Sequence, residues 1–260
     1  MDTAKHVFRL KIAEQIIEVH SLHQKCMDLC ADYLCVDNDE SISSDILVDI
    51  VPRNIVREND ASQKMNNSDS NDVYLYYDPG YLECFAVHRK ICEAMPELGT
   101  FMMHGAVVAY DGFAYMFTAP SGVGKSTRVK LWLQEYPGSY VINGDKPFLK
   151  VLDHSVVAYG SPWCGKEHWN TNIGLPLQAI FILERAAGEE ENSLQELSLE
   201  QAYSAILKQT YQPRNQKALV ETLRLLCNLE GKVRLFQLKS EPTIEGIRLA
   251  YEGARPREIS

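Results

Sequence analysis

Apolar and polar positions divide the chain into a short amino-terminal part and a longer part in which strand and helix patterns alternate. Residues 7–12 and 15–20 alternate apolar and polar side chains, as half-buried strands do, and residues 45–51 predict a further strand. A helix is expected around residues 22–34. Residues 61–72 have almost nothing to bury, which predicts a flexible surface loop or a joint between domains.

The remainder of the chain has the pattern of an α/β domain. We therefore expect a small α+β unit over residues 1–72 and a larger α/β domain over residues 73–260 that ends in helices. The expected elements are a helix over 79–98, strands over 101–110 and 113–118 joined by a hairpin turn, a helix over 125–136, strands over 139–143, 148–160 (a pair) and 177–183, and helices from residue 198 onward.

Composition narrows the classes of partner. The 260-residue chain carries a net charge of −9, which argues against nucleic acid and against an anionic membrane surface. No apolar run approaches the ~20 residues that span a bilayer, and the first residues lack the layout of a signal peptide. Seven cysteines, an odd number, are typical of reduced thiols. We expect a cytoplasmic protein with a small-molecule or peptide partner.

The strongest motif is a glycine-rich loop placed between an expected strand and an expected helix. Such a loop turns backbone N–H groups inward around phosphate, and the helix dipole adds to the attraction. The usual first glycine is replaced by Ala119, which requires a negative φ at that position. Lys125 can reach the β- and γ-phosphates, and the Ser126 hydroxyl can ligate Mg²⁺. The nucleotide-binding residues are expected to be Ser121, Gly122, Val123, Gly124, Lys125, Ser126 and Thr127.

Asp145 follows the expected strand over 139–143, twenty residues after Lys125. One helix and one returning strand fill that interval, so its carboxylate would lie beside the mouth of the loop. An acid there either holds Mg²⁺ or accepts the proton of an attacking hydroxyl. An ordinary turn is the alternative, because Gly-Asp-Lys-Pro is a turn-like sequence.

These residues resemble the catalytic domain of HPr kinase/phosphorylase. The resemblance is carried by His104-Gly105 on a strand, Ser121-Gly-Val-Gly-Lys-Ser126 and the acid at the next strand end. The chain more closely resembles small HPr-kinase-like bacterial proteins, which have stretches similar to residues 142–147, 162–166 and 183–185. The resemblance spans roughly residues 100–250. It implies a P-loop kinase core that is also similar to phosphoenolpyruvate carboxykinase.

Residue by residue, the resemblance implies that Lys125 binds phosphate, Ser126 binds Mg²⁺, His104 lies beside the phosphate loop and Asp145 is the acid. The bifunctional family has two consecutive acids here, whereas Asp145 has Gly144 and Lys146 as neighbours. This departure leaves open which acid role Asp145 fills and whether the reverse phosphorolysis occurs. Lys146 either neutralises transferred charge or faces solvent. HPr kinases form oligomers, so a homo-oligomer is a further expectation.

Residues 161–174 form a loop with two tryptophans, which is more apolar surface than a connection needs. One interpretation is a substrate wall in which Lys166 faces the transferring phosphoryl group while Trp163 and Trp169 exclude water. The other is that the rings plug the core. Arg185 would bind phosphate at the same strand-end edge or pair with a neighbouring acid.

Several cysteines and histidines raise further possibilities. His23, Cys26 and Cys30 would share one helix face and, with His20, could bind zinc. Buried structural thiols explain the cysteines equally. Cys164 could act as a nucleophile beside Lys166, or it could be a passive thiol.

Taken together, the residues predict an ATP- and Mg²⁺-dependent kinase that transfers the γ-phosphoryl group to a hydroxyl of a small metabolite or of a Ser/Thr in a peptide or small protein. The residues expected to act directly are Asp145, Lys125, His104 and Lys166. Two alternatives stay open. One is an NTPase or a carboxykinase-type phosphoryl transferase, and the other is a nucleotide-sensing adaptor without catalysis.

Overall fold

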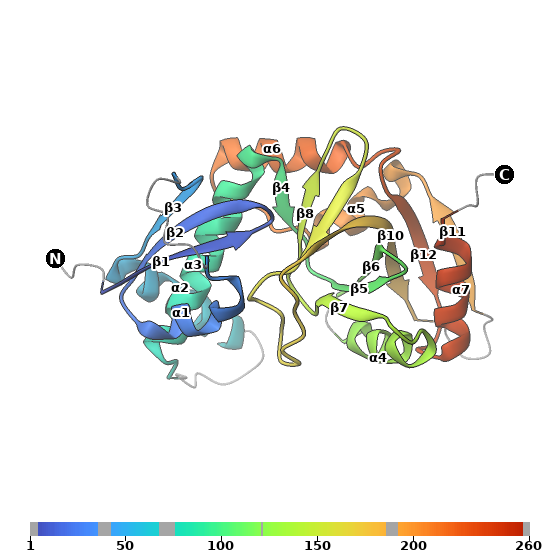
Figure 1. Ribbon diagram of the computed structural model, residues 1–260, viewed down its shortest axis with the longest axis horizontal. Coiled ribbons are helices and arrows are strands. Elements are labelled where there is room, and N and C mark those ends of the chain that lie inside the picture. The colour runs from blue at the N-terminus through green and yellow to red at the C-terminus, as the bar shows by residue number, and fades with distance from the viewer. Residues whose placement is uncertain (1–4, 36–42, 68–75, 121, 186–191, 257–260) are drawn as a thin grey trace. The chain divides into compact units, whose positions relative to one another are not determined.

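The computed structural model describes residues 5–35, 43–67, 76–120, 122–185 and 192–256. The chain forms two compact units, Met1–Ala94 and Met95–Ser260, each with its own sheet (Figure 1). The sequence placed this division between residues 72 and 73. It lies later because α3 (Pro79–Ala94) packs against the helices and the third strand of the amino-terminal unit.

The amino-terminal unit is a three-stranded sheet covered by helices. Strands β1 and β2 are antiparallel, and β3 joins β2 in parallel. The expected alternation places Leu10, Ile17 and Val19 in the core, where each is fully buried. The elements of this unit are β1 (His6–Ile12), β2 (Gln15–Ser21), α1 (Gln24–Leu29), the 3₁₀ helix η1 (Ala31–Tyr33), β3 (Ile46–Asp49), α2 (Pro52–Asn67) and α3.

Helix α2 corrects the sequence prediction of a loop over 61–72. Residues 61–67 belong to the helix, and residues 68–72 lie outside the described residues. The segment is weakly apolar, but packing against α3 and an ion pair of 2.6 Å between Arg89 Nε and Glu58 Oε1 secure it. Tertiary contacts therefore outweigh composition here.

The carboxy-terminal unit contains a nine-stranded mixed sheet that curls along its length. The strand order is β4-β8-β9-β10-β6-β5-β7, and β12 joins β10 and carries β11. Its elements are the 3₁₀ helix η2 (Met95–Leu98), β4 (Thr100–Met102), β5 (Ala106–Tyr110), β6 (Phe113–Thr118), α4 (Lys125–Glu135), β7 (Tyr140–Asn143), β8 (Phe148–Val151), β9 (Val156–Tyr159), β10 (Gly174–Glu184), β11 (Ser193–Leu197), α5 (Leu199–Gln209), α6 (Gln216–Cys227), β12 (Arg234–Lys239) and α7 (Ile244–Ala254).

Strand β10 links the two parts of this sheet. Its first residues pair antiparallel with β9. From Leu177 it runs parallel to β6, with an irregularity between Leu177 and Ala179, and from Ala179 it also runs parallel to β12. Helices α4 and α7 cover one face, while α5 and α6 cover the other (Figure 1). Alternate residues of each central strand therefore enter different cores. On β6, for example, Tyr115 and Met116 belong to opposite faces.

Two further expectations for this unit are corrected. The carboxy-terminal region is not helical throughout, because β12 is a central strand parallel to β10 and β11 pairs with it. The strand expected over 101–110 is interrupted after Met102, since β4 pairs with β8 whereas β5 pairs with β6 and β7. The interruption falls at His104. Within the described part of the chain, every helix is too short or too polar to cross a bilayer.

Candidate functional site

The glycine-rich loop connects the end of β6 to the start of α4, as the sequence predicts. Gly122 and Gly124 have φ of +82° and +101°, which L side chains rarely adopt. Ala119 is buried and is not among the residues with positive φ, so its methyl group is tolerated. Ser121 lies outside the described residues.

Lys125 lies at the first position of α4 and folds back over the loop. Its Nζ donates to the carbonyl oxygens of Ala119 at 2.7 Å and Pro120 at 3.3 Å. Burial lowers the pKa of the Lys125 ammonium, and the negative charge of Asp145 opposes that shift. The lysine therefore brings a positive charge to the inside of the loop.

Asp145 lies in the turn after β7 and contacts two basic side chains. Its Oδ1 is 3.0 Å from His104 Nδ1, and its Oδ2 is 2.6 Å from Lys146 Nζ. Burial raises the pKa of the Asp145 carboxyl, but hydrogen bonds from His104 and Lys146 outweigh it and hold this pKa well below its usual range. The carboxylate is thus ionised at neutral pH.

Asn143 fixes the turn that carries Asp145, and sequence analysis did not single it out. This fully buried residue accepts the backbone N–H groups of Asp145 and Lys146 on Oδ1, at 2.9 and 2.7 Å. Its Nδ2 donates to the Ser161 carbonyl at 2.9 Å. The sequence signal was an Asn two residues before an acid at a strand end, which is typical of a side-chain-capped turn.

His104 is held in place through its backbone. Its N–H donates to the Gln209 carbonyl at 2.7 Å, and its carbonyl accepts the Thr118 hydroxyl at 2.7 Å. The next residue must be glycine, because a Cβ on Gly105 would lie 2.8 Å from the Phe117 carbonyl oxygen. Since the Gly105 N–H also donates to the Asp145 carbonyl at 3.0 Å, His104 and Asp145 are kept adjacent.

A cavity of about 690 Å³ brings these residues together. Its walls are formed by the glycine-rich loop, the start of α4, the turn that carries Asp145 and part of the loop over 161–174. Lys130 and Glu167 belong to it as well, although sequence analysis did not name them. The lining residues are His104, Gly122, Gly124, Lys125, Ser126, Thr127, Lys130, Gly144, Asp145, Gly165, Lys166 and Glu167.

The loop over 161–174 serves both the cavity and the core. Lys166 lines the cavity, whereas Trp163 is only 6% exposed and does not line it. Trp169 packs beside the α4 core, and Lys130 Nζ lies 5.8 Å from the centre of its ring. Trp163 therefore follows the interpretation in which the ring packs into the core. Only Lys166 and its neighbours in the loop are placed to contact a substrate in the cavity.

Three other sequence candidates occupy positions around the cavity. Lys146 reaches it only through its ion pair with Asp145. Arg185 donates to the Gly122 carbonyl at 2.8 Å and does not line the cavity. Cys164 is buried, accepts a hydrogen bond of 3.3 Å from Asn170 Nδ2, and has a raised thiol pKa because of burial, all of which describe a passive thiol.

The zinc candidates of the amino-terminal unit have other partners in the structure. Cys26 and Cys30 are fully buried, and the pKa of the Cys26 thiol is raised by its contact with Cys30 and by burial. His20 Nε2 bonds Glu18 at 2.9 Å, whereas the His23 backbone donates to the buried Glu83 at 2.8 Å. Over the residues that the structure describes, no group of three or more His, Cys, Asp or Glu is arranged to hold a metal ion.

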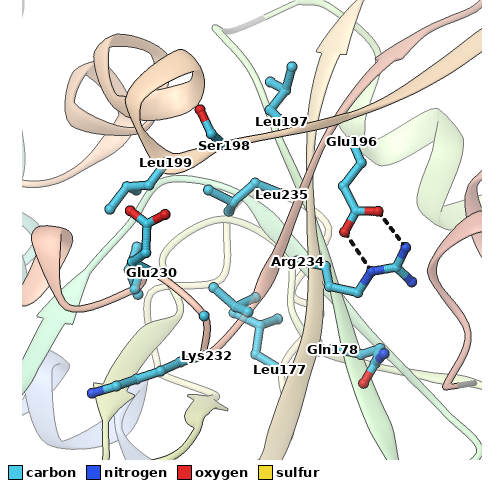
Figure 2. A pocket seen from close by; sticks show the side chains of 13 residues that line it. Leu177, Gln178, Glu196, Leu197, Ser198, Leu199, Glu230, Lys232, Arg234 and Leu235 are labelled. Carbon is cyan, nitrogen blue, oxygen red and sulfur yellow. Dashed lines mark hydrogen bonds and ion pairs between the residues drawn. The ribbon is translucent and has the colours of Figure 1, made fainter.

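A second cavity, of about 310 Å³, lies near the beginning of β12 and α5 (Figure 2). Its charged side chains include Arg234 and Glu196, which pair through two hydrogen bonds of 2.8 and 2.9 Å. Several leucines, among them Leu177 and Leu235, form much of its remaining lining. It offers no group comparable to the His104–Asp145 pair.

Comparison with known proteins does not place the chain in a family. No family model matches the chain, and no curated protein matches it. Among solved structures, the Hpr(Ser) kinase/phosphatase from Coxiella burnetii aligns with 49% of this chain and 90% of its own, at 14% sequence identity and a TM-score of 0.27. This is a distant structural neighbour, and the mixed α/β architecture with a curled sheet follows from the strand pairing described above.

Proposed function

We propose that the protein is an ATP- and Mg²⁺-dependent phosphotransferase that moves the γ-phosphoryl group to a hydroxyl of a small metabolite or of a Ser/Thr in a peptide. The observation that carries the proposal is one cavity lined by a glycine-rich loop, Lys125 and the His104–Asp145 pair. An anion receptor and an ionised acid in one cavity are the two parts that phosphoryl transfer requires.

The residues fit a magnesium nucleotide in their chemistry. Ser126 and Asp145 offer hydroxyl and carboxylate oxygens, the ligands that Mg²⁺ prefers, and both line the cavity. Bound there, the ion would offset negative charge on the phosphates. Lys125 and the loop amides would also offset negative charge on the phosphates. Lys166, exposed on the cavity wall, would face the acceptor and the group being transferred.

Asp145 is the acid of the proposed reaction. It would accept the acceptor hydroxyl's proton as the acceptor oxygen bonds to the γ-phosphorus and the bond to the ADP oxygen breaks. Its pKa, well below the usual range, makes it a weak base, so its main contribution is to orient the hydroxyl. His104 Nδ1 would donate a hydrogen bond to Asp145 Oδ1 and so fix the carboxylate.

The test compares Lys125→Ala with Lys217→Ala, which removes the same charge from an exposed site paired with Glu97. We expect Lys125→Ala to lower phosphoryl transfer by about 100-fold or more, because charge stabilisation in the transition state is lost. Isotopically labelled ATP, offered together with metabolite pools and peptides, would measure the transfer of the label to an acceptor. Unchanged ATP consumption in Lys125→Ala, at an unchanged melting temperature, would contradict the proposal.

A nucleotide-sensing adaptor is the second candidate. It is favoured by one observation: both oxygens of Asp145 already contact basic side chains, which leaves the carboxylate less free to take part in chemistry. ATP binding without transfer to any acceptor, and no effect of Asp145→Asn, would support it. The cytoplasmic location and the homo-oligomer stay predictions.

A further inference from the structure

Two arginines hold consecutive carbonyl groups of the glycine-rich loop. Arg185, directly after β10, donates from Nη2 to the Gly122 carbonyl at 2.8 Å. Arg128, the fourth residue of α4, donates from Nη1 to the Val123 carbonyl at 3.1 Å. Neither arginine lines the 690 Å³ cavity, whereas Gly122 and Gly124 do. The arginines therefore contact the loop from outside the site.

These two contacts set the direction of the loop amides. In a planar trans peptide the carbonyl and the following N–H point in opposite directions. The carbonyls of Gly122 and Val123 are turned toward the arginines, so the N–H groups of Val123 and Gly124 point the other way. Successive N–H groups on one side of a loop form an anion-binding nest.

Arg128 adds a buried charge to this arrangement. It is 1% exposed, and burial lowers the pKa of its guanidinium. Besides Val123, its hydrogen-bond partners among the described residues are the Ser240 carbonyl and the Ser240 hydroxyl, all of them neutral. A buried cation without a hydrogen-bonded carboxylate is costly. The charge of Glu241 offsets part of that cost, Arg185 adds to it, and an anion bound in the cavity would reduce it further.

Gly124 lies between the Arg128 guanidinium and the cavity. A Cβ built on Gly124 would lie 3.0 Å from Arg128 Nη1. Because Gly124 itself lines the cavity, the guanidinium lies directly behind the cavity wall. A phosphate on the other side of Gly124 would experience its field with little intervening solvent.

We propose that Arg128 and Arg185 are positioning residues that hold the loop carbonyls outward and its amides toward the cavity, with the charge of Arg128 adding to the attraction for a polyphosphate. The inference rests on the proposed function, since it concerns how the same loop receives the nucleotide. It assigns Arg185 to the loop itself rather than to the phosphate.

The first experiment measures amide hydrogen exchange over residues 119–127 in the nucleotide-free protein. We expect about tenfold faster exchange in Arg185→Met and in Arg128→Met than in the wild type, because the loop loses an anchor. The matched control is Arg248→Met, which breaks a contact of 2.6 Å with Glu135 at the other end of α4. Unchanged exchange in Arg185→Met would overturn the proposal, as expected if that arginine contacted only phosphate.

The second experiment measures MgATP affinity by calorimetry. We expect the dissociation constant to rise about tenfold in Arg185→Met and in Arg128→Met and to stay near the wild-type value in Arg248→Met. Arg128→Lys keeps the charge but cannot reach both Val123 and Ser240, so its dissociation constant is expected between wild type and Arg128→Met. Wild-type affinity in both methionine variants would overturn the proposal.

The two readouts separate this inference from the proposed function. If the wild type itself binds no MgATP, the proposed function fails, while hydrogen exchange still decides whether the arginines anchor the loop. If the Arg128 variants do not fold, the exposed Arg185 carries the test alone, because its removal leaves the core intact.

Discussion

At the scale of single residues, the site depends on side chains with no catalytic signature of their own. Asn143 is not among the residues that line the cavity, yet it holds the backbone N–H groups of Asp145 and Lys146 in the turn that presents Asp145. Arg128 likewise does not line the cavity, but it bonds the Val123 carbonyl of the glycine-rich loop. Sequence motifs identify groups that meet a ligand, whereas buried positioning groups are identified by their hydrogen bonds.

We predict that Asn143→Ala lowers the free energy of unfolding by about 1–3 kcal/mol, because two half-buried backbone N–H groups lose their acceptor. Urea denaturation measures the loss, and phosphoryl transfer is expected to fall with it since Asp145 is no longer fixed.

Asn143→Asp is the comparison variant, because it keeps the acceptor for both N–H groups, although it replaces the donor to Ser161 with a carboxylate oxygen and adds a buried negative charge. It should fall between wild type and Asn143→Ala. An Asn143→Ala protein as stable and as active as the wild type would refute this role.

At the scale of elements, strand ends and helix starts decide where chemistry is placed. The interruption between β4 and β5 brings His104 to Asp145, and the start of α4 brings Lys125 to the same cavity. Helix α5 begins with a complete capping box, in which Ser198 and Gln201 satisfy each other's backbone N–H groups. Ser198 lines the second cavity and not the 690 Å³ cavity, so a substitution there is expected to change stability without changing nucleotide binding.

Ser198→Ala is expected to lower the free energy of unfolding by about 1 kcal/mol, as loss of an N-cap side chain does, without altering MgATP affinity. Thermal denaturation and calorimetry measure the two quantities. Ser198→Asp retains an oxygen for the cap and should restore most of the stability. A changed MgATP affinity in Ser198→Ala would show that the two cavities are coupled.

At the scale of the whole molecule, pH should act on the carboxy-terminal unit through Asp145. The folded-state pKa of this carboxyl lies below its ordinary value near 4, so the folded protein binds the proton less readily than the unfolded chain. The stabilisation is therefore complete above about pH 4 and is lost as the pH falls further. All three tryptophans belong to this unit, so their fluorescence reports its unfolding alone.

We predict that the wild type loses stability below about pH 4 more steeply than Asp145→Asn, whose amide has no proton to gain. Urea titrations followed by tryptophan fluorescence at pH 7, 5, 4 and 3 would measure the slopes. Parallel slopes for the two proteins would mean that Asp145 titrates normally in the folded state.

Local signals in the sequence determined the parts of this protein that local physics controls. Alternating positions predicted β1 and β2, and a continuous apolar run predicted β6. The hairpin turn and the glycine-rich loop were recognisable because each needs glycine at a positive φ. Lys125 and Asp145 were placed on one edge from the length of one helix and one strand. Both line the same cavity.

Only the tertiary structure decided what depends on partners distant in sequence. The weakly apolar α2 is helical because it packs on α3, and β12 is a strand because β10 pairs with it. Contacts between residues distant in sequence also determine where the two units divide, why Trp163 is buried and that Arg128 bonds Ser240. A residue's own chemistry states which contacts it can make, and the fold selects among them.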